Sequence, residues 1–178
     1  MIKPCPLPEP FFSRFERLRI RALNYSHPPV FTVTEGLPFK GDIPGGHTKN
    51  LFLKDKKDQI FLVTALQDTV INLKALHEPL GSGRLSFGSP GLLQDVLGVI
   101  PGAVTPLALC NDMRRRVIPV LDRRLLSCRL VNCHPLRNDM TTGLTPQDLV
   151  LYLTDMGYRP VVIDFSGQQP ILCTEGIL

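Results

Sequence analysis

The sequence predicts an α/β protein (α+β mixed) with one curled, mixed β-sheet surrounded by helices. Its 178 residues are enough for one substantial core, and 43% of them are hydrophobic, as in ordinary globular domains. Strand-like and helix-like segments are mixed along the chain without the strict alternation of a βαβ fold. Because no repeat, low-complexity segment or linker interrupts the chain, we expect residues 1–178 to form a single domain.

The first third of the chain is predicted to contain one helix and three strands. Apolar residues at helical spacing predict an amphipathic helix over residues 10–24. The two prolines of HPPVFTVTE end this helix, and the β-rich residues 30–34 predict a strand. The apolar stretches 51–53 and 60–63 flank the polar KDKKDQ, which predicts a hairpin with arms buried on both faces.

The middle of the chain is predicted to contain a short helix over residues 70–78 and a second, better marked helix. Ser89-Pro90 combines an N-cap residue with a proline at the first helical position, and Gly98 can end the helix that follows. The stretch VIPGAVTPLALC then passes from a glycine-proline loop into a strand. Residues 117–121 are predicted to be the hairpin partner of that strand.

The C-terminal part is predicted to contain two strands and one helix. Residues 130–132 are predicted to form a short strand. Thr145-Pro146 repeats the cap-plus-proline signal and opens a helix that closes at Gly157. The apolar run in PVVIDF predicts a buried strand.

Composition and charge limit the classes of protein to which this chain can belong. The net charge of +4 permits a polyanionic partner without requiring one. Arginines gather in RFERLRIR and NDMRRRVIPVLDRR, and either group could contact phosphates of such a partner. The alternative is a solvated helix face for the first segment and a hairpin turn for the second. No apolar run approaches the roughly eighteen residues of a membrane span. Five irregularly spaced cysteines do not resemble a disulfide framework, and the proline-rich N-terminus does not resemble a signal peptide, so we expect a cytoplasmic protein.

Signals for a metal or a nucleophile are weak. Cys128, Cys133 and His134 form C-x4-C-H, but structural zinc normally needs four ligands, so we expect buried thiols and no metal. The sequence has no G-x-S-x-G elbow and no G-x-x-x-x-G-K-[ST] phosphate loop. A Cys133–His134 pair is not expected, because adjacent residues on a strand point to opposite faces.

The glycine-rich turns are more informative. Gly45-Gly46 lies just before Lys49, and Gly102 begins GAVTP, a G-x-x-x-P segment. Glycines let a backbone approach a ligand closely and turn its N–H groups toward it. Such groups, or a lysine ammonium, can stabilise a developing oxyanion at an ester carbonyl, and a lysine can also hold a phosphate. The alternatives are a solvated turn lysine at position 49 and, for His134, a loop histidine bonded to the backbone.

Four segments, taken together, resemble a known family. HPPVFTV, PGGHTKNLFLKDKK, LGVIPGAVTPLAL and CHPLRNDMTTGLT are similar, in order and spacing, to the free-standing prolyl-tRNA editing proteins of the YbaK/EbsC-like superfamily, in particular the PrdX or ProXp-ala group. The resemblance covers roughly residues 10–166. It implies the fold of the editing domain of prolyl-tRNA synthetase, no cofactor, and hydrolysis of the ester in mischarged Ala-tRNA(Pro).

The resemblance also implies which residues form the site. Its catalytic positions are Lys49, Gly102 and His134. Its substrate-binding positions are Asn50, Ala103, Val104, Thr105, Pro106 and Asn138, with Val30, Phe31 and Val33 as candidates for the apolar lining. Cys133 stands where an aromatic or other apolar residue is expected, which bears on the choice of amino acid.

The implied partner is the acceptor end of tRNA(Pro) carrying a misattached amino acid, with prolyl-tRNA synthetase as a transient partner and neither membrane nor DNA. The resemblance implies that the neighbouring 2′-hydroxyl of the substrate helps to activate water, so no serine or cysteine nucleophile is needed. Two alternatives stay open. One is a deacylase of the same fold that acts on another misacylated tRNA, carrying cysteine or serine. The other is a non-catalytic tRNA-binding or synthetase-associated module.

Overall fold

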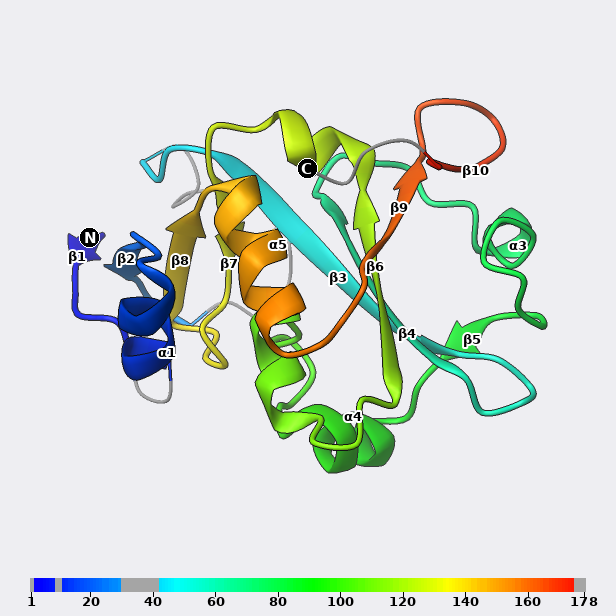
Figure 1. Ribbon diagram of the computed structural model, residues 1–178, viewed down its shortest axis with the longest axis horizontal. Helices are drawn as coiled ribbons and strands as arrows, with labels where there is room; N and C mark the ends of the chain where they lie inside the picture. Colours follow the sequence, from blue (N-terminus) through cyan, green and yellow to red (C-terminus); the bar gives the residue numbers. More distant parts are fainter. Residues whose placement is uncertain (1, 9–10, 30–41, 175–178) are drawn as a thin grey trace.

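The protein is built on one mixed β-sheet, seen in a computed structural model that describes residues 2–8, 11–29 and 42–174. The strands are β1 (Lys3–Pro4), β2 (Leu23–Ser26), β3 (Gly46–Lys54), β4 (Ile60–Leu66), β5 (Ser86–Phe87), β6 (Val117–Asp122), β7 (Val131–Cys133), β8 (Met140–Leu144), β9 (Val161–Asp164) and β10 (Ile171–Leu172). Their order across the sheet is β1-β2-β8-β7-β3-β4-β6-β9-β10, and β5 pairs with β3 (Figure 1). The pairs β3–β7, β4–β6 and β6–β9 are parallel, so the predicted mixed sheet is confirmed.

Helices cover the sheet unevenly. They are α1 (Phe11–Leu18), α3 (Leu73–Leu76), α4 (Pro90–Leu97) and α5 (Pro146–Asp155), with the 3₁₀ helices η1 (Pro106–Asn111) and η2 (Arg123–Ser127). Figure 1 shows α5 in front of the sheet, with α1 and α4 on the same side and α3 apart from them, near β5.

The two faces of the sheet bury separate cores. The larger core packs α1, α4, η1 and α5 against one face, here called the helix face, and includes Phe52 and Leu62 of the central strands. The smaller core contains Leu53 and Val63, together with Leu76 of α3, and lies on what we call the α3 face. Because neighbouring residues of a strand point to opposite faces, β3 and β4 contribute to both cores. The prediction of a hairpin buried on both faces is therefore confirmed.

The two predicted cap-plus-proline helix starts are confirmed. The Ser89 side chain accepts a hydrogen bond from Leu92 N at 3.1 Å, and the Thr145 side chain accepts one from Asp148 N at 3.1 Å. Gly98 ends α4 with φ +63°, a left-handed conformation that glycine adopts without the penalty of a Cβ.

The predicted strand through VIPGAVTPLALC is wrong, because residues from Pro106 onward form η1. The cause is local: Thr105 caps this helix by accepting from Leu107 N at 3.3 Å, and Pro106 occupies its first turn. The predicted hairpin partner at 117–121 is a strand, but it pairs in parallel with β4 and β9. Parallel neighbours need a long crossover, and the chain between β4 and β6, with its helices, supplies it.

The predicted helix over 10–24 is shorter than expected. It ends at Leu18, and Arg19 follows with φ +56° while Ile20 N donates to Phe15 O at 2.9 Å. The chain then enters β2, which pairs antiparallel with β8. The helix expected at 70–78 reduces to the four residues of α3, and β7 begins one residue later than the strand expected at 130–132. The strand expected at 30–34 lies outside the described residues.

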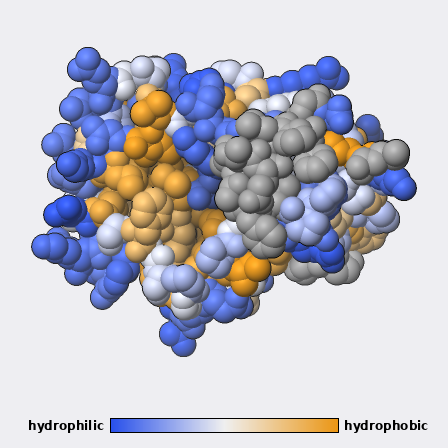
Figure 2. Space-filling model, turned by 180° about the vertical axis from the view of Figure 1, so that it is seen from behind, coloured by the Kyte–Doolittle hydropathy of each residue, from blue (hydrophilic) through white to orange (hydrophobic). Residues whose placement is uncertain are grey.

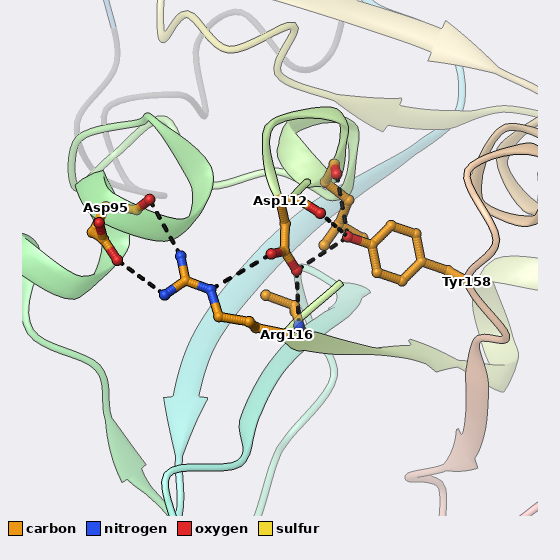
Figure 3. A network of polar contacts seen from close by, with 6 residues as sticks. Asp95, Asp112, Arg116 and Tyr158 are labelled. Carbon is orange, nitrogen blue, oxygen red and sulfur yellow. Dashed lines mark hydrogen bonds and ion pairs between the residues drawn. The ribbon is translucent and has the colours of Figure 1, made fainter. Parts of the chain in front are cut away.

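Asp112 joins η1, β6 and the chain after α5 (Figure 3). Its Oδ2 accepts hydrogen bonds from Val117 N at 2.9 Å and from the Tyr158 hydroxyl at 3.1 Å. Arg116 lies beside the other carboxylate oxygen, at 3.7 Å, and also binds Asp95 on α4 at 3.0 Å. This network holds the beginning of β6, and Asp122 lies at the other end of the same strand.

Within residues 2–8, 11–29 and 42–174, no helix is both long and apolar enough to cross a membrane. Figure 2 shows that the face turned away from the viewer of Figure 1 has a hydrophobic area bordered by hydrophilic residues.

Candidate functional site

The double glycine allows β3 to enter the sheet next to the chain that leads into β7. Gly45 has φ +115°, and a Cβ on it would lie 2.8 Å from Leu130 Cβ. Gly46 donates its N–H to Leu130 O at 2.8 Å, and a Cβ on it would lie 2.8 Å from Cys128 Sγ. A side chain at either position would therefore push the two segments apart. The glycines set the entry of the strand, and Lys49 lies inside that strand three residues later.

Lys49 belongs to a row of side chains that crosses the sheet. It pairs with Ala65 of β4, and the parallel β4–β6 register, continued by one residue, puts Asp122 beside Ala65. On the other side, β3 pairs in parallel with β7 up to His47 and Asn132, and His134 follows directly after β7. Alternation along β3 places Lys49 on the α3 face, the face of Leu51. Lys49 and His134 thus come from neighbouring segments, one in β3 and the other directly after β7.

The ammonium group of Lys49 is anchored to the backbone. Its Nζ donates a hydrogen bond to the carbonyl oxygen of Thr69, in the turn that follows β4. The Thr69 hydroxyl in turn donates to Asp122 Oδ2 at 2.5 Å. Asp122 is fully buried at the end of β6. An ammonium has three N–H donors, so this anchor leaves two for other acceptors.

An ion pair lies beside this anchor. Arg124 donates to Asp68 Oδ2 at 3.0 Å and to the Thr69 hydroxyl at 3.3 Å. The hydrogen bond from Arg124 is the main reason that the pKa of Asp68 lies below its ordinary value, and the positive charge of Lys49 contributes. The turn next to Lys49 therefore carries a carboxylate, and η2 places a half-exposed guanidinium against it.

Asn50 points the other way. Its Oδ1 accepts a hydrogen bond from the Thr64 hydroxyl at 2.8 Å, and Thr64 is its register partner on β4. Because Asn50 alternates with Lys49 and shares the side of Phe52, its side chain lies on the helix face. The two adjacent residues predicted for the site are therefore presented to opposite faces of the sheet.

His134 follows β7 and is held by the beginning of β8. Its Nδ1 lies 2.9 Å from Met140 O, and since a carbonyl only accepts, Nδ1 carries the proton in this contact. A second histidine, His27, lies close by, with its ring centroid 6.4 Å from that of His134. The Nε2 of His27 lies 2.9 Å from the Thr141 hydroxyl, on β8. His27, the first residue of HPPVFTV, thus lies beside the segment CHPLRND.

The loop after His134 contains a buried amide without a partner. Asn138 Nδ2 is buried and has no hydrogen-bond partner in the structure. Arg137 and Asp139, on either side, form a two-point ion pair at 2.8 and 2.6 Å, which lowers the pKa of Asp139. Leu136 has φ +61°, which is uncommon for a residue other than glycine. A buried donor without an acceptor is unfavourable, so Asn138 is suited to receive one from a ligand.

The G-x-x-x-P segment connects α4 to η1. Gly102 has φ +92°, and the N–H of Ala103 already donates to Ile100 O at 3.0 Å. Ala103 belongs to the core of the helix face, and Val104 packs against it. Thr105 and Pro106 form the start of η1, as described above. The segment is therefore well held, and its apolar side chains pack in the larger core.

The cysteines of the C-x4-C-H segment do not form a metal site or a nucleophilic pair. Cys133 is buried in the core of the helix face, and burial raises the pKa of its thiol to about 12. Cys128 is half-buried after η2, and burial raises its pKa as well. In the described part of the chain, no three His, Cys, Asp or Glu side chains gather as metal ligands do.

Sequence reasoning missed Asp122, Thr69 and His27. A signal existed for Asp122, because VIPVLD carries a carboxylate directly after an apolar, buried strand. The role of Thr69 depends on a turn and could not be read from its neighbours. Val30, Phe31 and Val33, predicted to line the pocket, lie outside the described residues.

Comparison with known proteins identifies the family. The family model described as aminoacyl-tRNA editing domain matches residues 27–151. The chain is 40% identical over 167 residues to prolyl-tRNA synthetase associated domain-containing protein 1 of Danio rerio, covering 93% of this chain and 91% of that protein. It is 36% identical over 138 residues to the prolyl-tRNA editing protein ProX of Acetoanaerobium sticklandii, covering 77% and 84%.

A solved structure has the same fold. The crystal structure of a protein described as a candidate trans-editing enzyme for prolyl-tRNA synthetase superposes with a TM-score of 0.66 at 19% identity, over 88% of this chain and 94% of that one. At this identity the likeness concerns the fold alone. The family model and the relatives of similar length together show that the chain belongs to the aminoacyl-tRNA editing domain family.

Proposed function

We propose that this protein is a trans-editing deacylase that hydrolyses the ester bond of Ala-tRNA(Pro). The observation that carries the proposal is the anchored ammonium of Lys49 on β3, the strand that pairs with β7 ahead of His134, in a chain of the aminoacyl-tRNA editing domain family. The similarity to a protein named for prolyl-tRNA editing supports proline tRNA as the tRNA. The proposal includes a cytoplasmic location, a transient contact with prolyl-tRNA synthetase, and no cofactor.

In the proposed reaction, water attacks the carbonyl carbon of the ester, and the bond to the ribose oxygen breaks. The ester is already activated, so positioning and charge stabilisation are the main requirements. Lys49 contacts the 3′-terminal nucleotide and the carbonyl region, using the two donors that Thr69 leaves. The neighbouring 2′-hydroxyl of the substrate helps to activate the water, and this agrees with a Cys133 thiol that burial keeps protonated.

The remaining residues would bind the amino acid. Backbone N–H groups in the segment from Gly102 to Thr105 orient it, although the N–H of Ala103 is engaged with Ile100. His134 forms a wall of the pocket, and the Nδ2 of Asn138, buried without an acceptor, donates to the substrate. Asn50, on the helix face, would support the site only through its bond to Thr64 on β4, and Val30, Phe31 and Val33 provide apolar lining.

The physical need for such an enzyme lies in the size of alanine. A synthetase pocket built for proline cannot strongly reject a smaller side chain, because a methylene in an apolar pocket contributes only about 1–3 kcal/mol. A second pocket sized for alanine excludes proline by steric clash. We therefore expect rapid hydrolysis of Ala-tRNA(Pro) and very slow hydrolysis of Pro-tRNA(Pro).

The first test measures deacylation of both tRNAs by the wild type, Lys49→Ala and Lys56→Ala. Lys56 lies in the exposed β3–β4 turn and serves as the matched control. We expect loss of alanine only, a fall in rate of at least about 100-fold in Lys49→Ala, as for removal of one oxyanion donor, and wild-type rates in Lys56→Ala. Equal hydrolysis of the two tRNAs would contradict the alanine specificity.

Two outcomes would lead to the alternatives. Hydrolysis of tRNA carrying cysteine or serine, without hydrolysis of Ala-tRNA(Pro), would indicate a deacylase of the same fold with another substrate. Binding of tRNA or of prolyl-tRNA synthetase without hydrolysis of any ester would indicate an associated, non-catalytic module, as the name of the Danio rerio relative allows for that protein.

A further inference from the structure

A fully buried carboxylate lies at the end of β6, on the side of Lys49. Asp122 accepts hydrogen bonds from the Thr69 hydroxyl at 2.5 Å, from Leu66 N at 3.3 Å and from Arg124 N at 3.0 Å. Burying a charged group is unfavourable unless its hydrogen-bonding capacity is met. Here it is met by groups from two separate segments, the turn after β4 and the start of η2.

The carboxylate fixes both ends of the turn after β4. Leu66 and Thr69 are the first and last residues of this turn, which is closed by a hydrogen bond from Thr69 N to Leu66 O at 3.0 Å. Asp122 binds the backbone N–H of the first and the hydroxyl of the last. The turn cannot rotate about its own axis without breaking one of these bonds, so the direction of the Thr69 carbonyl is set by Asp122.

The Thr69 carbonyl is the group that receives the ammonium of Lys49. Lys49 and Asp122 lie in one row across β3, β4 and β6, with Ala65 between them. Two strand spacings separate their backbones by about 10 Å, too far for a direct contact between the Lys49 backbone and the carboxylate. The turn with Thr69 spans this gap. Ala65 lies between the two residues on the same face, and its small side chain leaves room for the turn.

We propose that Asp122 is a positioning residue, which acts through Thr69 to hold the ammonium of Lys49 in the orientation needed for deacylation. The inference rests on the proposed function, in which Lys49 contacts the substrate. A lysine side chain has several rotatable bonds, and ordering it costs conformational entropy. A fixed carbonyl that takes one N–H orders the ammonium before the substrate arrives, and it directs the remaining two donors.

The chain contains a matched control for this carboxylate. Asp112 is also buried, binds a backbone N–H and a hydroxyl, and lies at the opposite end of the same strand, away from Lys49. Asp122→Asn and Asp112→Asn therefore make the same chemical change in two similar buried networks. A purely structural role of Asp122 predicts the same consequences for both.

The first experiment observes the ammonium group directly. In protein labelled with ¹⁵N-lysine, the Lys49 ammonium signal is identified by its loss in Lys49→Ala. A hydrogen-bonded, ordered ammonium exchanges its protons slowly, so we expect its signal in the wild type, Asp112→Asn and Thr69→Ser. We expect the signal to be lost in Asp122→Asn and Thr69→Val, because the first removes the carboxylate and the second removes the hydroxyl that it binds.

The second experiment measures kcat and KM for Ala-tRNA(Pro) with the same variants. We expect kcat to fall about 100-fold in Asp122→Asn and Thr69→Val, as for a misplaced catalytic group, with KM little changed. Thr69→Ser and Asp112→Asn are expected to keep the wild-type kcat. Should Asp122→Asn fail to fold, the Thr69→Val and Thr69→Ser pair carries the test.

The outcomes separate this inference from the function on which it rests. Wild-type kcat in both Asp122→Asn and Thr69→Val, with or without the ammonium signal, would overturn the positioning role. An equal fall of kcat in Asp112→Asn and Asp122→Asn would also overturn it, because the effect would then be general destabilisation. If the wild type hydrolyses no Ala-tRNA(Pro), the proposed function fails, while the ammonium signal still decides whether Asp122 orders Lys49.

Discussion

Burial gives Cys133 and His134 different chemistry although they are adjacent in the chain. The thiol lies in the core of the helix face, where the charged thiolate is unfavourable, and its pKa rises to about 12. His134 lies beyond the end of β7 and binds the backbone of β8 through Nδ1. At neutral pH the cysteine is therefore an inert part of the core, whereas the histidine is a polar group outside that core.

This difference predicts that Cys133 resists alkylation. When the native protein is treated with iodoacetamide at pH 8, Cys133 should stay unmodified until the protein unfolds. The half-buried Cys128 is the internal comparison, and we expect it to react faster. Peptide mass spectrometry over time checks this order. Cys133→Ala should also keep deacylase activity. A complete loss of activity in a folded variant would instead indicate that the thiol acts as a nucleophile.

At the scale of elements, carboxylates close the turns that connect the strands. Asp55 follows β3 and accepts hydrogen bonds from Lys57 N at 2.7 Å, from Gln59 N at 3.0 Å and from Gly83 N at 2.9 Å. The bond from Gly83 is the largest cause of a pKa below the ordinary value for aspartate. The same carboxylate thus shapes the β3–β4 turn and ties it to the loop before β5.

The lowered pKa of Asp55 predicts a pH dependence of stability. A carboxyl whose folded-state pKa lies below its unfolded value, about 3.9, stabilises the folded state above that value and loses this contribution as pH falls through the folded-state pKa. The free energy of unfolding should therefore fall in acid, and this fall should be shallower in Asp55→Asn. Urea unfolding at a series of pH values from 7 downward measures the slope.

The control for Asp55 is a carboxylate in the same turn. The side chain of Asp58 is 85% exposed, so Asp58→Asn should keep the acid slope of the wild type. If Asp55→Asn and the wild type lost stability equally as pH fell, Asp55 would not be the group responsible.

At the scale of the whole molecule, the sheet separates the two arginine groups that the sequence offers for tRNA. Residues 114–116 precede β6 and residues 123–124 follow it. A strand of six residues extends about 3.3 Å per residue, so the groups lie about 20 Å apart. Arg124, in η2, binds the Thr69 hydroxyl in the turn that anchors Lys49, whereas Arg116 is held by Asp95 at the far end. The two groups therefore cannot contact the same phosphates.

This separation predicts unequal effects on tRNA binding. Arg123 is 65% exposed and lies at the Lys49 end of β6, so Arg123→Gln should weaken binding of tRNA(Pro) and reduce its salt dependence by about one phosphate contact. Arg114→Gln, an exposed arginine at the other end, is the matched control and should bind as the wild type does. Equal weakening by both changes, measured by fluorescence anisotropy over a range of salt concentrations, would contradict a tRNA end docked beside Lys49.

The sequence by itself determined the mixed α/β class, the buried hairpin and the two helices that begin with Ser89-Pro90 and Thr145-Pro146. These features depend on residues close together in the chain, namely alternation, apolar runs and caps. The Thr105-Pro106 start of η1 carried the same local signal and could have been found. The family resemblance, which the comparisons confirm, also came from contiguous motifs.

Only the tertiary structure decided which segments become neighbours. From the sequence, residues 117–121 are predicted to be the hairpin partner of a strand in VIPGAVTPLALC. In the structure, β6 instead lies in parallel between β4 and β9. A strand buried on both faces favours such a central place in the sheet. That place puts Asp122 in line with Lys49, while alternation along β3 puts Asn50 on the other face. Contacts such as Thr69 with Asp122 join residues 53 positions apart. No local pattern encodes them, since they follow from strand order and register.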